Sequence, residues 1–552
     1  MSGEQQVERK IVRDFRQILL WPLQLVPIRE GSQIQEHWEL LEREATDNPW
    51  SELQDEFGCD PAEFQQRHYS EFVTFLPYVR RFLYGDANRG GVAGASKSPI
   101  RVFRRADVAK LRITCSNEGE THTLAVSHVD LYFFYDLDVI ILVVEIAAHD
   151  LTLTQAQDLM YRLGRAYPTY WNEDGSGGHC LQRVEWLGGD DTVLAVSDYE
   201  QRDKYLSFVG RNRAPRFAAH WAFLLKPLVY DHSDLKGAIR FRQVEYSRMP
   251  LLAYLAMDDA RALTRADFVR LGLVTGAGPS DTLPYSERHI QDFEYRYCFD
   301  QYWNEQRIGN PGTRFMSCGH AFAVVGDARD SFFVDRDAGL LGQFRHQYFL
   351  LFLIPHFHKA ALLMLSDRMV DALNKLDISN AESIKVFKRT IRQLLEIFLR
   401  FTHRYWFHEV SDQPQAREIY RMTANYLGTD RLYAEIREEI EDMSEYLESD
   451  TLRRQANTVV RLTVVTIFGL IGTIVTGFFG MNIFGFSEIP WQWQVVILFA
   501  AIIGVSGFTF VTLAKSKRLS DFLEAISDER LPPSAKVRSL LDVARKVRRS
   551  PL

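Results

Sequence analysis

Residues 462–514 read LTVVTIFGLIGTIVTGFFGMNIFGFSEIPWQWQVVILFAAIIGVSGFTFVTLA. This stretch contains no Lys or Arg, and Glu488 is its only charged residue. It consists of two apolar runs separated by a short break. A helix of about 20 residues is about 30 Å long, which matches the hydrocarbon core of a bilayer. The sequence therefore predicts two transmembrane helices, residues 459–482 and 491–514, joined by an external loop, residues 483–490.

Basic residues flank this stretch on both sides, whereas the loop between the two runs has none. Because cytoplasmic flanks of membrane helices are enriched in Lys and Arg, both long flanks are predicted to be cytoplasmic. Trp491 and Trp493 fall at the opposite edge, where amphipathic rings favour the headgroup layer. The pattern predicts a multi-pass protein of the plasma membrane, or the inner membrane of a bacterium, with cytoplasmic N- and C-termini. The basic residues are Arg453, Arg454 and Arg461 before the stretch and Lys515, Lys517 and Arg518 after it.

The rest of the chain has the composition of a water-soluble protein. The whole chain has 552 residues, of which 25% are charged, and its net charge is -7. No basic field is present to hold a polyanion, so nucleic acid is not an expected partner. The five cysteines form no CxxC pair, and the N-terminus shows no presequence pattern. The large soluble part is therefore predicted to be cytosolic and without a disulfide framework.

An α/β domain is predicted for residues 126–354. Residues 129–148 are rich in β-branched and aromatic side chains and predict two strands, followed by a capped helix over residues 153–167. Further strands are predicted at residues 192–197, 217–225, 321–325 and 347–354. Residues 1–125 are treated as an unassigned cytoplasmic extension, in which residues 11–26 fit a buried helix or strand better than a membrane-surface segment.

A helical hairpin and a stalk helix are predicted for residues 355–458. Two helices, residues 355–375 and 381–408, are separated by a break at residues 379–380. From Gln415 onward no proline occurs before the membrane, so a long helix is expected to run into the first apolar run, with Gly428 as an interruption. Residues 515–552 form a basic cytoplasmic tail.

Two membrane helices cannot enclose an aqueous pore, so any channel built from this chain must be an oligomer. The first run is rich in Gly and Thr, which permit close helix packing or line a pore. The second run is more uniformly bulky and apolar, which suits contact with lipid. The first run is therefore the better pore candidate, although helix packing alone also explains its small residues.

The first run ends with Phe479, Gly480, Met481 and Asn482, and here the chain resembles the CorA family of magnesium channels, whose signature is Gly-Met-Asn. A short loop, a Trp-x-Trp pair, a final apolar helix and a basic tail follow in the family's order. The resemblance covers the C-terminal third of the chain. It implies a non-enzymatic homo-oligomer, a pentamer, with no cofactor other than magnesium as the transported and regulatory ion. The chain departs from the family at Phe479, Phe484 and Ile471, where Tyr, an acidic residue and Pro are usual.

Gly480, Met481 and Asn482 are the candidate selectivity filter. Magnesium loses its water reluctantly, so an outer filter should bind the hydrated ion. The carbonyl oxygen of Asn482 can accept hydrogen bonds from the ion's water, and a ring of such amides would hold a dication loosely. The alternative is a helix C-cap, for which Asn is also suited.

A stripe at helical spacing leads back from Asn482 and predicts the pore lining. By the resemblance, a hydroxyl ring lies below the Asn and apolar rings lie nearer the cytoplasm, where they gate by dewetting. The external Glu488 is expected to attract cations. The stripe consists of Thr473, Leu470, Thr466, Leu462 and Val459.

An acidic cluster lies on the predicted stalk before the membrane. It either concentrates cations and binds regulatory magnesium between subunits, or it is a solvated helix face with charge pairs to nearby arginines. Both interpretations remain open at this stage. The cluster comprises Glu438, Glu441, Asp442, Glu445, Glu448 and Asp450.

Two other functions are compatible with the sequence. One is a transporter of zinc or another transition metal from the same superfamily, and the other is a non-conducting membrane-anchored scaffold or sensor. The sequence contains no Walker loop, dinucleotide fingerprint or hydrolase elbow. His179-Cys180 and Cys318-Gly319-His320 lack the spacing of a known zinc site. The expected partners are thus other copies of the chain, the bilayer and divalent cations.

Overall fold

The computed structural model describes residues 10–28, 36–43, 48–53, 66–85, 99–115, 120–245, 247–303, 312–377, 380–480, 490–493, 495–497, 499–500, 503–504 and 507. The chain divides into two compact units, residues 1–440 and 441–552. Each unit is described by itself.

The first unit contains all of the described strands and most of the helices. The strands are β1 Ile11–Leu25, β2 Trp50–Glu52, β3 Ile100–Arg105, β4 Lys110–Thr114, β5 Thr121–Phe134, β6 Val139–Thr152, β7 Arg183–Leu187, β8 Val193–Val196, β9 Val229–Tyr230, β10 Arg240–Gln243, β11 Leu251–Met257, β12 Cys298–Phe299, β13 Arg314–Ser317 and β14 Ala321–Asp327. The helices are α1 His37–Arg43, α2 Gln66–Thr74, α3 Pro77–Tyr84, α4 Leu153–Arg162, α5 Arg202–Asn212, α6 Ala219–Leu224, α7 Arg265–Leu273, α8 Glu287–Tyr297, α9 Ser331–Val334, α10 Leu340–Gln343, α11 Phe349–Asn374, α12 Ala381–Arg404, α13 Pro414–Leu427 and α14 Thr429–Gly480, which continues into the second unit.

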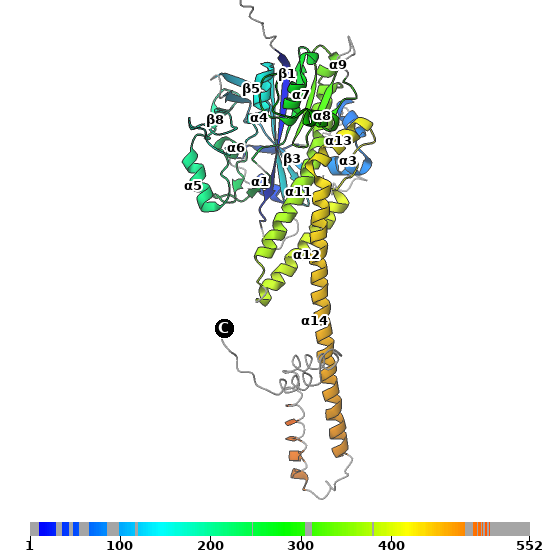
Figure 1. Cartoon of the computed structure of the whole chain (residues 1–552). Coiled ribbons are helices and arrows are strands. Elements are labelled where there is room, and N and C mark those ends of the chain that lie inside the picture. Colours follow the sequence, from blue (N-terminus) through cyan, green and yellow to red (C-terminus); the bar gives the residue numbers. More distant parts are fainter. Residues whose placement is uncertain are drawn as a thin grey trace, which may run out of the picture. The chain divides into compact units, whose positions relative to one another are not determined.

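The described strands form one mixed sheet with the order β12-β13-β14-β11-β1-β6-β5-β4-β7-β8. β1 lies in the middle and pairs antiparallel with both β6 and β11, while β11 and β14 are parallel. Figure 1 shows α5 and α6 near the β8 end of the sheet and α7 to α9 near the β14 end. The sheet thus draws strands from both sides of residue 125, so the division of the sequence there does not correspond to a structural boundary.

Both faces of the central strands are covered. α4 and α11 each pack on β1 and β6. Leu19, Trp21 and Leu23 of β1 belong to the same buried cluster as Leu159 of α4, and the residues that alternate with them face the other way. A strand buried on both faces needs apolar side chains at nearly every position. This explains why residues 11–25 lack the alternation that would have identified them as a strand.

Several predicted elements are confirmed, and two are wrong. The β5–β6 hairpin, the start of α4 at Leu153, and strands at residues 192–197 and 321–325 are present. Residues 217–225 were predicted as a strand but contain α6, and residues 347–354 lie in a π-helical turn, Phe344–Tyr348, and the first turns of α11. Both are short apolar runs, in which buried helix and buried strand have the same composition.

α11 is the one helix that meets the length and composition of a membrane span in the described part of the chain. Together with α10 and the π-helical turn before it, α11 forms a continuous helical segment, Leu340–Asn374. This segment has a mean hydropathy of 1.6, but 78% of its most apolar window is buried inside the structure. Its burial beside β1 and β6 is that of a core helix. The first predicted membrane helix appears there only as a shorter apolar segment, Thr458–Ile467.

The helical hairpin is formed by α11 and α12, which contact each other and are joined through residues 375–380. Asn380 caps α12 by accepting a hydrogen bond from the backbone N–H of Glu382. The long helix predicted from Gln415, with Gly428 as an interruption, is divided in two at that residue, whose φ of 68° ends α13. That left-handed conformation favours glycine, so the interruption is fixed locally.

The tip of the β5–β6 hairpin is tied to α11 and α12 by buried carboxylates. Asp136, whose side chain is inaccessible, accepts from Arg404 Nη1 at 2.8 Å and from the Tyr405 hydroxyl at 2.7 Å. Asp138 pairs with Arg368 of α11. These bonds join the sheet to helices that are remote in the sequence.

A second buried ionic network joins β6 to the π-helical turn before α11. Glu145 is fully buried and lies 2.7 Å from His128 Nε2, 3.2 Å from Arg16 Nη1 and 2.8 Å from Arg345 Nε. Burial opposes its charge, but His128 and Arg345 outweigh this effect and lower the pKa of Glu145 to about 2. Burial likewise opposes the charge of His128, but Asp130 and Glu145 raise the pKa of His128 to about 9.

These shifts predict a pH-dependent stability. The contribution of His128 to the free energy of unfolding is complete below its ordinary pKa of about 6.5 and is lost as the pH rises through about 9. The contribution of Glu145 is complete above its ordinary pKa of about 4.5 and is lost as the pH falls through about 2. Thermal unfolding of the full chain, followed by tryptophan fluorescence from about pH 5 to about pH 10, should show a midpoint that falls above about pH 6.5. His128→Gln should remove most of this fall, and an unchanged slope in that variant would contradict the assignment.

Candidate functional site

α14 carries the described part of the predicted pore lining. It is one helix of 52 residues, so the stalk and the first apolar run are continuous. Counted at 100° per residue, the predicted stripe occupies about 80° of the helix circumference. From Val459 to Gly480 the helix rises by about 32 Å. The stripe residues, from Val459 to Thr473, therefore share one face over about 21 Å of this rise.

The apolar members of the stripe are exposed in the single chain. Val459 is 61% exposed, Leu462 66% and Leu470 60%. Large apolar side chains in a row are costly in water, so this face requires lipid or other protein chains around it.

The threonines of the stripe have their hydroxyl protons engaged. Thr466 donates to the carbonyl oxygen of Leu462 at 2.8 Å, and Thr473 donates to that of Gly469 at 2.9 Å. Each hydroxyl oxygen keeps lone pairs that can accept a hydrogen bond from water. The two side chains can thus act as acceptors for a hydrated cation.

The glycines of this helix are not required by packing within one chain. An added Cβ at Gly469, Gly477 or Gly480 would have no neighbour within 4 Å. Small residues that make no close contact inside a chain are suited to close approach by another one. The single chain therefore leaves room along α14 for neighbouring helices.

The filter itself is only partly described. Gly480 is the last residue of α14, while Met481, Asn482 and Glu488 lie outside the described residues. In the second apolar run, Pro490 accepts a backbone hydrogen bond from Trp493, and residues 491–493, 495–497 and 499–500 are helical. The two predicted spans and the geometry of the filter remain predictions.

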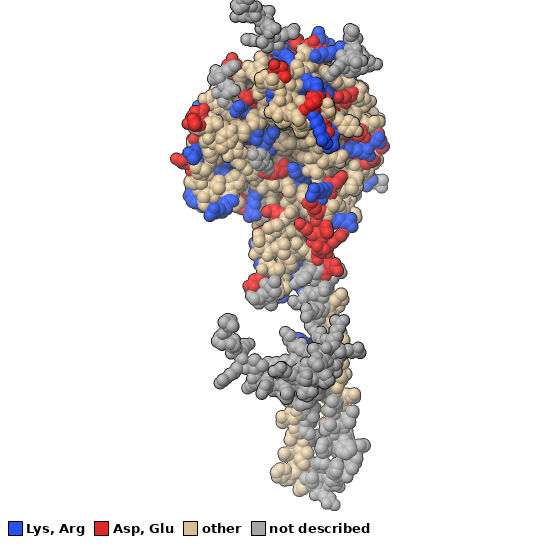
Figure 2. Space-filling model, viewed as in Figure 1, with Lys and Arg blue, Asp and Glu red and all other residues tan. Residues whose placement is uncertain are grey.

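The acidic cluster is exposed on α14, and Figure 2 shows acidic side chains gathered over the first turns of this helix. Glu438, Glu441, Asp442 and Glu445 are all exposed, and the side chains of Glu448 and Asp450 are outside the description. The described residues contain no group of three or more His, Cys, Asp or Glu arranged to hold a metal ion. The described members of the cluster thus do not form a preformed metal site.

The histidines near α11 have structural contacts. His356 Nδ1 lies 2.8 Å from the carbonyl oxygen of Phe352, and His358 Nε2 lies 2.5 Å from that of Tyr405. Burial lowers the pKa of both to about 3, so both side chains are neutral. They serve the core rather than a metal site.

Comparison with known proteins gives one match. The model of the CorA-like Mg2+ transporter protein family matches residues 366–517, which include the end of α11, α12, α13, α14 and the second apolar run. No curated protein and no solved structure matches the chain. The match confirms the resemblance inferred from the sequence: residues 366–517 are similar to the CorA-like Mg2+ transporter protein family.

Proposed function

We propose that this chain forms a homo-oligomeric channel, a pentamer by its resemblance, that conducts divalent cations across the membrane, magnesium first among them. The carrying observation is that the family match spans the exposed stripe of α14. In the assembly, the stripes of the first membrane helices surround the axis. Thr473 and Thr466 then accept hydrogen bonds from ion-bound water, and Leu470, Leu462 and Val459 form apolar constrictions that gate by dewetting.

A ring of Asn482 is proposed to select the hydrated ion at the outer end of this path. An uncharged amide accepts hydrogen bonds from water without holding the dication as tightly as a carboxylate would. The membrane potential supplies the driving force, since a dication crossing about 100 mV gains about 4.6 kcal/mol. No enzyme activity or cofactor is needed for this function.

The test is ion flux with the purified full chain in liposomes. Magnesium, zinc, cobalt and nickel are compared with and without an imposed potential. Potential-driven magnesium entry supports the proposal, whereas zinc entry that needs a proton gradient would favour a transition-metal transporter. A stable monomer in mild detergent, with no flux of any ion, would leave only the membrane-anchored scaffold.

Glu488 offers a further prediction, because it is the sole charge between the flanking basic clusters. Glu488→Gln should weaken uptake at low external magnesium and matter little at saturating magnesium, since a fixed charge at the mouth acts on ion encounter. Flux across a magnesium titration, at low and high ionic strength, measures this, and salt should reduce the difference. A lower maximal rate at every concentration would instead make Glu488 a direct ligand.

A further inference from the structure

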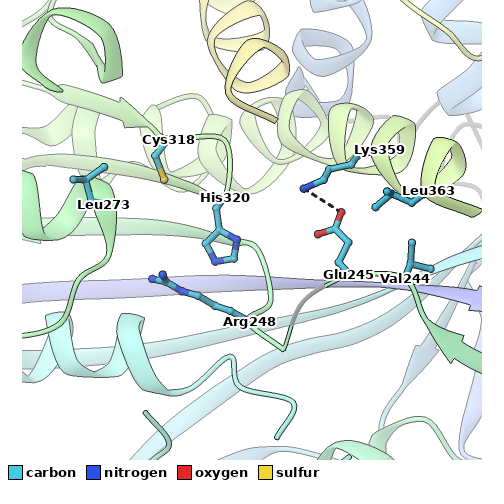
Figure 3. A pocket seen from close by; sticks show the side chains of 8 residues that line it. All are labelled: Val244, Glu245, Arg248, Leu273, Cys318, His320, Lys359 and Leu363. Atoms are coloured by element: carbon cyan, nitrogen blue, oxygen red, sulfur yellow. Dashed lines mark ion pairs between the residues drawn. The ribbon is translucent and has the colours of Figure 1, made fainter. Parts of the chain in front are cut away.

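A cavity of about 510 Å³ lies in the first unit between the sheet and α11. Figure 3 shows its side chains converging from four separate parts of the chain. The volume falls in the range of small-molecule sites. The cavity is lined by Val244, Glu245 and Arg248 after β10, Leu273 of α7, Cys318 and His320 at the β13–β14 turn, and Lys359 and Leu363 of α11.

The charges in this cavity sum to about +1. Arg248 and Lys359 are cationic, and Glu245 Oε1 lies 3.8 Å from Lys359 Nζ. His320 adds no charge, because its burial and the nearby Arg248 hold its pKa well below the ordinary value. Burial raises the pKa of Glu245, although Lys359 opposes that shift. A single negative charge is therefore what the cavity can neutralise.

His320 Nε2 and Glu245 Oε1 are among the cavity's polar atoms that are buried without a hydrogen-bond partner in the described part of the chain. Buried polar groups in proteins are nearly always paired. In Figure 3 the ring of His320 lies between Arg248 and the Glu245–Lys359 pair. A ligand placed there would give the ring nitrogen of His320 a partner and would lie beside both cations.

A metal ion does not fit this arrangement. The described residues form no group of three or more metal-binding side chains. The apolar walls, Val244, Leu273 and Leu363, instead suit a carbon skeleton.

We propose that this cavity binds a small organic monoanion, a carboxylate with a short apolar body. The carboxylate lies between Arg248 and Lys359 and accepts a hydrogen bond from the neutral ring of His320 through Nε2. The apolar body packs on Leu363 and on Val244, which lies beside it in Figure 3. A doubly charged anion is disfavoured, because Glu245 cancels one of the two cations.

The walls of the cavity reach the joint between α13 and α14. Gly319, between Cys318 and His320, has φ +80°, and a Cβ there would lie 2.8 Å from the backbone of Tyr426. Ser317 Oγ lies 3.1 Å from Thr423 Oγ1 of α13. Since Gly428 follows directly and starts the break before α14, a bound anion acts on the base of the stalk helix. This second step, modulation of transport, rests on the proposed function.

Binding is tested by calorimetry on the detergent-solubilised full chain with three probes: hexanoate, acetate and hexylammonium. Hexanoate should bind, acetate more weakly for lack of an apolar body, and hexylammonium not at all. Lys359→Gln should weaken hexanoate binding about tenfold, as loss of one charged hydrogen bond predicts. No hexanoate binding, or equal binding of hexylammonium, overturns the proposal.

A matched pair of variants controls for folding and for nonspecific partitioning. Leu363→Trp fills the cavity and should abolish binding, whereas Val370→Trp adds the same ring at an exposed position of α11 and should leave it unchanged. Equal loss in both variants overturns the assignment of the site. Ion flux with and without hexanoate then tests whether binding modulates transport. If the chain binds hexanoate but conducts no ion, the proposed channel function is overturned and the binding site stands. If hexanoate binds but leaves flux unaltered, only the modulation of transport is overturned.

Discussion

Asn482→Ala is expected to abolish magnesium uptake while expression and oligomeric assembly stay near normal. An alanine methyl group cannot accept hydrogen bonds from the water bound to the ion. A ring of alanines therefore cannot replace the hydrogen bonds that the hydrated ion gives up when it leaves bulk water. Growth of a magnesium-requiring, uptake-deficient strain and flux in liposomes both measure the loss. Assembly is checked by mass measurement in detergent.

Gly480→Ala should cause a similar loss for a steric reason that lies between chains. Because a Cβ at Gly480 meets nothing within 4 Å in the described part of the chain, a clash with those residues cannot explain a defect. Gly504→Ala in the second apolar run has the same free space and serves as the control, with uptake near normal. Full activity of both Asn482→Ala and Gly480→Ala would show that the tripeptide here is only a helix terminus.

The C-terminal part of the chain was predictable because its signals are local. Neighbouring residues alone reveal the run without Lys or Arg, the three-residue motif and the helical spacing. The family match over residues 366–517 confirms the resemblance that these features indicated. Gly428 was also visible, since a glycine at φ 68° needs no distant partner. Helix capping and periodicity decide such features within a few residues.

The sheet was less predictable, because its order depends on pairings between distant segments. β1 comes from residues 11–25 and lies between β6 and β11, yet its apolar run fits a buried helix as well as a strand. The same ambiguity made residues 217–225 and 347–354 appear as strands. In each case tertiary burial, rather than local preference, selected the element.

The cavity residues were missed for the same reason. No sequence motif includes Glu245, Arg248 or Lys359. In the sequence, Cys318-Gly319-His320 stands out only as two metal donors, which lack the spacing of a known zinc site. Their common site appears when α11, the β13–β14 turn and the segment after β10 are brought together. The sequence signal that remains is weak: a charged residue, Lys359, within the otherwise apolar first half of α11.

Glu145→Gln is expected to destabilise the first unit by about 3 to 5 kcal/mol, the cost of removing one partner from a buried ionic group. Arg16, His128 and Arg345 all lie within 3.2 Å of this carboxylate and would lose its charge together. Glutamine keeps the volume and one acceptor oxygen, so the change reports charge rather than a cavity. Thermal and urea unfolding of the full chain by tryptophan fluorescence measure the loss.

Glu185→Gln provides the matched control, because it removes a strand carboxylate that also accepts from two arginines. Its partners Arg112 and Arg183 have side chains that are 37% and 58% exposed, so water can replace the lost charge. Because the side chain of Glu185 is itself only 8% exposed, the expected cost is above that of a surface ion pair, about 1 to 3 kcal/mol, and below that of Glu145. Glu145 differs in that its own side chain is inaccessible and Arg345 comes from the π-helical turn that starts α11. Equal destabilisation by the two variants would show that burial of this network adds nothing, and that α11 is held on the sheet by its apolar contacts alone.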